Sequence, residues 1–98
     1  MPMESQILVY ASKYDVSYEE IYKTIKCESN FNPEAVGDSG RARGVAQFWR
    51  ITFDAYNQEY FNGKLEYLST EDQINLMAKM FSEGEQKHWV CFKKVVSL

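Results

Sequence analysis

The sequence predicts an all-α fold, with at most a minimal β excursion near residues 40–47. Apolar residues recur at helical spacing in four segments, and two of these segments open with a hydroxyl residue followed three positions later by Glu or Gln. The stretches between them are rich in Asn, Gly, Pro and Ser. With 98 residues, 45% of them hydrophobic, the chain is long enough for one small core. We therefore expect a single helical domain over residues 1–98.

The first helix is expected from about Glu4 to Tyr14. Ile7, Leu8 and Ala11 would share one side of it. The same stretch makes a poor signal peptide, because it has an acid near its start and only a short apolar centre. No apolar run in the sequence approaches the length needed to span a bilayer. We therefore expect a helix of the fold here, no export signal in this chain and no membrane insertion.

The second helix is expected to begin at Ser17 and to end near Ser29. Ser17-Tyr18-Glu19-Glu20 has the pattern of a capping box, in which a hydroxyl and a glutamate satisfy the first free amides of a helix. Pro33 prevents the helix from running much further, because it lacks an amide proton and clashes with the preceding turn. The segment that follows, residues 31–43, is predicted to be loop.

The third helix is expected to begin between Gly44 and Thr52 and to run to about Tyr60. Phe53 and Tyr56 lie at helical spacing within it. The Asn-Gly pair at residues 62–63 then marks either a hairpin turn or a helix end.

The fourth helix is expected to start at Thr70, where Gln73 completes a second capping box. Ile74 and Met77 lie on its apolar side, and Gly84 is a natural stop. The tail that follows, residues 88–92, is apolar enough to pack back on the core.

Two cysteines, Cys27 and Cys91, leave two alternatives open. They are either small buried apolar residues or one bridge that ties the second helix to the tail. We expect them to lie near each other, because the tail has few other apolar surfaces to cover. Their spacing matches no metal site, and His88, the one histidine, cannot form a metal site alone. We expect no metal and no cofactor.

The charge of the chain limits its partners. The formal net charge is −3, whereas a surface that binds phosphate backbones or anionic lipid needs clustered Lys and Arg. We therefore expect no nucleic-acid partner and no electrostatic docking to a membrane, and we expect a monomer.

Glu28 is the leading candidate for chemistry. It follows Ile21 and Ile25 at helical spacing, so a carboxylate lies on an otherwise apolar stripe at the C-terminal end of its helix. Burial and the negative end of the helix dipole both disfavour the charged form, so both should raise the pKa of this carboxyl. Such a group is suited to general acid catalysis, although on position alone a half-exposed surface glutamate is the commoner case.

Three ordered motifs carry a family resemblance. Residues 28–35, Glu-Ser-Asn-Phe-Asn-Pro-Glu-Ala, resemble the first motif of the soluble lytic transglycosylases, which are lysozyme-like enzymes that cut peptidoglycan strands. Residues 42–47, Ala-Arg-Gly-Val-Ala-Gln, resemble their second motif, Ala-x-Gly-Leu-Met-Gln, with two conservative replacements. Residues 71–74, Glu-Asp-Gln-Ile, resemble the start of their later helix. The resemblance spans roughly residues 17–84 and implies a small lysozyme-like catalytic domain.

The resemblance also implies a site. Glu28 would be the single catalytic acid and base, Ser29 a hydroxyl near it and the bound sugar, and Gln47 a ligand for sugar amides and hydroxyls. The backbone of Val45 and Ala46 would hold the substrate beside them. Short polar groups next to a glycine let a glycan approach the backbone closely.

One motif of the family is displaced. The Ala-Tyr-Asn motif should follow the later helix, but residues 55–57 precede it, so we interpret Tyr56 as a core residue. The family's tyrosine therefore has no assured counterpart, and Trp89 or Tyr67 is the candidate for the missing wall. We assign Trp89 to the substrate site. Of the other aromatic residues we expect one or two at most to line a cleft.

The implied reaction cuts the MurNAc–GlcNAc β-1,4 bond without consuming water. The substrate's own 6-hydroxyl, deprotonated by the same glutamate, closes on the anomeric carbon and leaves a 1,6-anhydroMurNAc end. Two alternatives stay open: a hydrolytic muramidase, in which Asp38 or Asp54 directs water, and a catalytically silent glycan-binding or structural module. We expect action in the cell wall, the periplasm or outside the cell, with delivery by a phage as one route.

Overall fold

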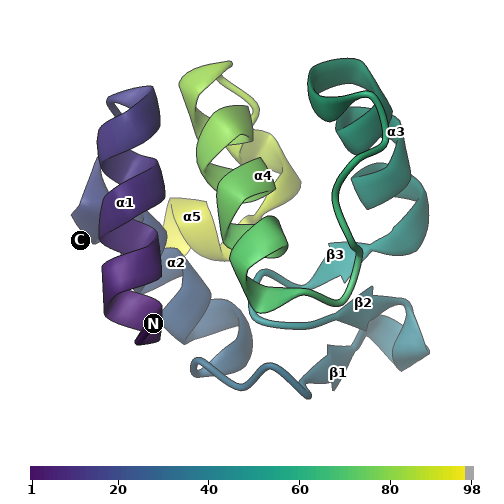
Figure 1. Ribbon diagram of the computed structural model, residues 1–98. Coiled ribbons are helices and arrows are strands. Elements are labelled where there is room, and N and C mark those ends of the chain that lie inside the picture. The colour runs from purple at the N-terminus through teal and green to yellow at the C-terminus, as the bar shows by residue number, and fades with distance from the viewer. Residues whose placement is uncertain (97–98) are drawn as a thin grey trace.

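Five α-helices and a small sheet make up the part of the chain that the structure, a computed structural model, describes, which is residues 1–96. In chain order the helices are α1 (Met3–Tyr14), α2 (Tyr18–Ser29), α3 (Arg50–Phe61), α4 (Thr70–Ser82) and α5 (Val90–Val96). The predicted mainly helical class is confirmed. In Figure 1, α1 and α4 stand side by side, α3 lies beyond α4, and the strands gather at one end of the molecule.

Helix α4 forms the centre of the core, because most of its side chains are buried. It packs mainly against α1, whose Ile7 and Ala11 are buried, and it also contacts α3. Helix α2 packs against α1 and α5. An edge-to-face group of Phe48, Phe53 and Trp89 continues the core toward the sheet. The core therefore joins the helices to the sheet region that lies between α2 and α3.

Helix ends follow the local chemistry of the sequence. The Ser17 hydroxyl accepts a hydrogen bond from the Glu20 amide, as the capping box predicts. At α4 the capping residue is Ser69, whose hydroxyl accepts from the Asp72 amide, so the expected cap at Thr70 is wrong by one residue. The Asn-Gly pair at residues 62–63 ends α3, with Asn62 in the left-handed conformation.

The sheet has three short antiparallel strands in the order β1 (Val36–Gly37), β2 (Ala42–Arg43) and β3 (Phe48–Trp49). Val36 pairs with Arg43, and Arg43 pairs with Phe48. A 3₁₀ turn, η1 (Asp38–Gly40), joins β1 to β2. The excursion is therefore wider than the expected residues 40–47. Each strand has only two residues, too few for the alternating pattern by which strands are recognised in sequences.

The C-terminal tail forms a second 3₁₀ turn, η2 (Gln86–His88), and helix α5, which the sequence did not predict. A disulfide joins Cys27 at the end of α2 to Cys91 at the start of α5, with Cα atoms 5.9 Å apart. Of the two alternatives for the cysteines, the structure contains the bridge. Within residues 1–96 no helix combines the length and apolar character required to cross a bilayer.

Candidate active site

Glu28 lies in the last turn of α2, half-buried against the start of α5. Burial raises the pKa of the Glu28 carboxyl, and the negative charge of Asp38 raises it further. The Cys91 amide, which donates a hydrogen bond to the carboxylate, and the Lys94 ammonium act in the opposite direction. The pKa of Glu28 is raised on balance, so the carboxyl keeps its proton to a higher pH than an exposed glutamate does.

The position of Glu28 depends on three elements that meet around it. Helix α2 supplies the residue, the disulfide from its neighbour Cys27 holds the start of α5, and α5 presents the Cys91 amide. Asp38 approaches from η1, in the turn between β1 and β2. Glu28 therefore lies at the junction between the helices and the sheet, where a polar group can be partly desolvated and still meet a ligand.

Ser29 points into the protein and not toward open space. It is buried, and its hydroxyl donates a hydrogen bond of 3.2 Å to the Ile25 carbonyl one turn earlier in α2. This arrangement satisfies the hydroxyl within the helix. In this geometry Ser29 supports the helix end that carries Glu28.

Gln47 closes the loop opposite, in the left-handed conformation with φ 53°. Its Nε2 donates hydrogen bonds to the Ala35 carbonyl, at 3.1 Å, and to the Gly44 carbonyl, at 2.9 Å. Its Oε1 accepts no hydrogen bond from any residue in the range 1–96. This oxygen faces Gly37, where an added Cβ would lie 2.5 Å from it. Gln47 thus fixes the loop with one end of its amide and leaves an acceptor at the other.

Val45 and Ala46, the middle of the second motif, are buried completely. The Ala46 amide donates to Gln73 Oε1 at 3.0 Å, and the Ala46 carbonyl accepts from Trp89 Nε1 at 2.8 Å. Both backbone groups of Ala46 are therefore engaged by the protein. Among residues 44–47 the partly exposed side chain is that of Gln47.

Trp89 lies beneath this segment, since only 4% of it is exposed. Its ring packs edge-on against Phe48 and Phe81 while its Nε1 holds the Ala46 carbonyl. The burial of the ring does not fit the exposed wall expected from the sequence. A role in positioning the Gln47 loop fits these contacts better.

Gln73 is a site residue that the sequence does not single out, because its pattern there is that of a capping box at the start of a helix. It is buried on α4, and its side chain makes three hydrogen bonds to backbone groups. Its Oε1 accepts from the Ala46 amide, and its Nε2 donates to the Arg43 and Tyr67 carbonyls at 3.1 and 2.8 Å. Gly44 makes this possible, since a Cβ there would lie 2.4 Å from Nε2. The resemblance of residues 71–74 to a family motif was the available signal.

Asp38 and Asp54, the two candidates for a second carboxylate, have different surroundings. Asp54 is exposed on α3 and pairs with Arg50, 3.1 Å away, one turn earlier in the same helix. Asp38 accepts a hydrogen bond of 3.0 Å from Trp49 Nε1 and acts electrostatically on Glu28. Asp38 is therefore the better candidate for a carboxylate that acts with Glu28.

In the displaced Ala-Tyr-Asn motif at residues 55–57, the polar side chains make hydrogen bonds within the fold. The Tyr56 hydroxyl donates to Glu85 at 2.7 Å, and this bond, with burial, raises the pKa of Tyr56 to about 12. The Asn57 amide pairs in both directions with the backbone of Leu65. His88 lies beside the Tyr56 hydroxyl, at 3.0 Å. No group of His, Cys, Asp and Glu within residues 1–96 is arranged to hold a metal ion.

Replacing Gln73 by leucine tests whether its hydrogen bonds to the backbone hold the site together. The substitution keeps the volume but leaves the Ala46 amide and the Arg43 and Tyr67 carbonyls without partners. We expect the free energy of unfolding to fall by about 2–5 kcal/mol in urea denaturation. Gln58→Leu, an exposed position on α3, is the matched control and should change it by less than about 0.5 kcal/mol. Equal effects of the two substitutions would contradict the role of Gln73.

The fold and the site together define a small, mainly helical domain in which one carboxyl of raised pKa lies where the helices meet a short sheet. The chain belongs to the transglycosylase SLT domain family, whose model matches residues 5–89. Comparisons with curated proteins and with solved structures gave no match. Membership implies peptidoglycan-related activity of the lytic transglycosylase or lysozyme type, exerted in the cell wall or periplasm.

Proposed function

We propose that this chain is a peptidoglycan lytic transglycosylase that cuts the MurNAc–GlcNAc β-1,4 bond with Glu28 as its single acid and base. The observation that carries the proposal is the state of Glu28. It is half-buried, its pKa is raised by that burial, and it opens the stretch that resembles the family's first motif, inside the residues 5–89 that the family model matches. A carboxyl that keeps its proton to a higher pH than an exposed glutamate is better able to donate it to a leaving oxygen.

In the proposed reaction Glu28 protonates the glycosidic oxygen as the bond from the muramyl C1 to that oxygen breaks. The substrate's N-acetyl group stabilises the positive charge that develops at C1. The Glu28 carboxylate then takes the proton of the 6-hydroxyl, and O6 forms a bond to C1. The products are a 1,6-anhydroMurNAc end and a free GlcNAc 4-hydroxyl, and Glu28 regains its proton without consuming water.

The other residues of the motifs support this step. The free Gln47 Oε1 is a suitable acceptor for a sugar amide or hydroxyl. Val45 and Ala46 form the fixed backbone beside it, held by Gln73 and by Trp89. Ser29 stabilises the turn that carries Glu28. We propose that the protein acts as a monomer in the wall, in the periplasm or outside the cell, where its disulfide persists.

A hydrolytic muramidase is the second candidate, with Asp38 in preference to Asp54 as its second carboxylate. An inverting or retaining hydrolase needs a second carboxylate roughly 5–10 Å from the acid. Asp38 is close enough to raise the pKa of Glu28, whereas Asp54 is paired with Arg50. The two candidates differ in whether a water molecule enters the product.

Digestion of purified peptidoglycan in ¹⁸O-labelled water separates these candidates by mass spectrometry of the released muropeptides. A transglycosylase releases muropeptides that lack the label, are lighter by one water than hydrolysed ones and have no reducing muramyl end. Labelled reducing ends would replace this proposal by the muramidase. If wild-type protein releases neither product, a catalytically silent glycan-binding or structural module replaces both enzymatic proposals.

Digestion with the Asp38→Asn variant further separates the transglycosylase from the hydrolase. The asparagine oxygen still accepts from Trp49 Nε1, so the turn should keep its shape. A transglycosylase should remain active in this variant. Its Glu28 pKa should fall, because a negative charge that raises it is gone, so the high-pH limb of the activity profile moves to lower pH. Loss of all product in Asp38→Asn would instead support the hydrolase.

A further inference from the structure

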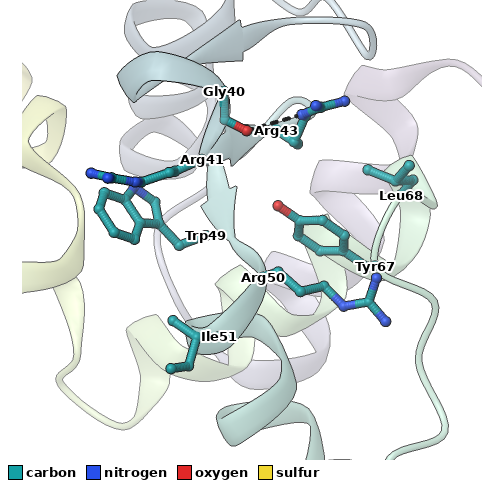
Figure 2. Close-up of a pocket in the computed structure, with 8 residues that line it drawn as sticks. All are labelled: Gly40, Arg41, Arg43, Trp49, Arg50, Ile51, Tyr67 and Leu68. Atoms are coloured by element: carbon teal, nitrogen blue, oxygen red, sulfur yellow. Dashed lines mark hydrogen bonds between the residues drawn. The ribbon is translucent and has the colours of Figure 1, made fainter.

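All three arginines of the sequence line one pocket of about 400 Å³, although the chain carries a net charge of −3. Arg41 and Arg43 come from the η1–β2 region, and Arg50 is the first residue of α3. Figure 2 shows them around the opening, with Trp49 beside Arg41 and the Tyr67 ring near Arg50. The other lining residues are Gly40, Ile51 and Leu68, and no acidic residue is among them. The pocket is therefore a cationic site on an anionic protein.

Two of the three guanidinium groups are free of carboxylate partners. Within residues 1–96, neither Arg41 nor Arg43 lies within 4.0 Å of a carboxylate oxygen. Arg43 Nε donates to the Gly40 carbonyl at 3.2 Å, and Arg41 lies 5.4 Å above the Trp49 ring. Arg50 is shared, since its Nε contacts Asp54 at 3.1 Å. The pocket can therefore accept an anion without first breaking a pair at Arg41 or Arg43.

Tyr67 shows that two of the charges converge. Burial raises the pKa of its hydroxyl, but Arg43 and Arg50 both act to lower it, which places both cations near the same ring. The hydroxyl itself donates to the Phe48 carbonyl at 2.6 Å, so the ring is fixed in place. Planar guanidinium groups on fixed supports bind carboxylates in a two-pronged manner.

The remaining lining of the pocket is apolar and exposed. Trp49 is 39% exposed, Ile51 76% and Leu68 64%, so large hydrophobic surfaces lie beside the arginines. An uncharged sugar would leave the guanidinium groups without partners, and an inorganic anion would leave the apolar surface uncovered. A short acidic peptide with small apolar side chains satisfies both halves of the lining.

The pocket is linked to Glu28 through two residues of the sheet region. Trp49 lines the pocket and bonds to Asp38, and Asp38 acts on Glu28. The pocket and Glu28 therefore lie on either side of the same Asp38–Trp49 pair. We propose that this pocket binds the acidic peptide stem of peptidoglycan through its carboxylates, an inference that rests on the proposed function for its substrate.

Binding of the free stem tetrapeptide L-Ala–γ-D-Glu–meso-diaminopimelate–D-Ala, followed by NMR titration, tests the pocket without any turnover. Arg43→Gln should weaken this binding at least about tenfold, since a charge-assisted hydrogen bond is lost. Lys64→Gln removes one exposed positive charge elsewhere and should leave binding unchanged. The same peptide with its carboxyls converted to amides should bind wild type at least about tenfold more weakly. Equal binding of acid and amide, or equal effects of the two substitutions, overturns the inference.

Turnover separates this inference from the proposed function. Sacculi that carry stems are compared with strands from which an amidase has removed them. Arg43→Gln should raise KM more on the stem-bearing substrate than on bare strands, and Lys64→Gln should change neither. If wild type turns over both substrates and Arg43→Gln changes KM equally on the two, the inference is overturned and the proposed function is not. A wild type that binds the peptide but cuts neither substrate overturns the proposed function alone.

Discussion

Glu28→Gln should lower the turnover of peptidoglycan by at least about 10²–10⁴-fold, because the amide can neither give nor take the proton that bond cleavage requires. The volume of the side chain is nearly kept, and the amide oxygen can still accept from the Cys91 amide. Initial rates of muropeptide release measure the effect. Glu34→Gln, an exposed carboxyl in the following loop, is the matched control and should retain wild-type rates. Wild-type cleavage by the Glu28 variant would remove the catalytic assignment.

The same variant has an expected signature in stability. The folded-state pKa of Glu28 is raised, so the wild-type carboxyl favours folding most when it is protonated, below its unfolded pKa of about 4.3. That contribution is lost as the pH rises through the folded-state pKa. Thermal melts at pH 7 should therefore show Glu28→Gln to be as stable as wild type or slightly more stable. This difference between variant and wild type should be less favourable to the variant at pH 3. A large loss of stability at pH 7 would mean that Glu28 is structural.

Removal of the disulfide should have the largest effect on stability. The bridge spans 64 residues, and closing a loop of that size contributes roughly 4 kcal/mol in the chain-entropy model. Substitution of both Cys27 and Cys91 by alanine should lower the melting temperature by on the order of 20 °C, given about 4–8 °C per kcal/mol for a domain of this size.

A reductant provides the control for that measurement. Wild type in excess dithiothreitol should melt near the temperature of the double variant, whereas the double variant should not respond to dithiothreitol. A wild type whose melting temperature is unaffected by complete reduction, verified by thiol titration, would contradict the stabilising role. Because Cys91 also presents its amide to Glu28, the reduced protein should lose turnover at temperatures where it is still folded.

Local signals in the sequence were enough to predict four of the helices. The Ser17 box and Asn62 act within a few residues, so the sequence contains the whole cause of these ends. Ser69 and Thr70 are adjacent hydroxyls, and only the backbone decides which of them caps α4. Helix α5 has no comparable start signal, and it is held by Cys27 from a distant part of the chain.

The site divides in the same way. Glu28 could be singled out because its anomaly, a carboxylate on an apolar stripe, is visible over one helix. The role of Gln73 could not, since its partners lie in three separate segments that meet only after folding. The three arginines lie on different elements as well, and their convergence on one pocket depends on how the sheet turns into α3.

The hydrogen bonds of Gln73 have a consequence for how such domains are recognised. They reach only main-chain groups, which any residue except proline supplies, so these bonds alone require no particular side chain at residue 46. What they do require is an amide side chain on α4 and a residue without a Cβ opposite it, Gln73 and Gly44. A search for remote members should therefore weight this glycine–glutamine pair above the apolar letters between them. Chains whose second motif differs at the apolar positions can then still be judged by whether they keep the glycine and the glutamine.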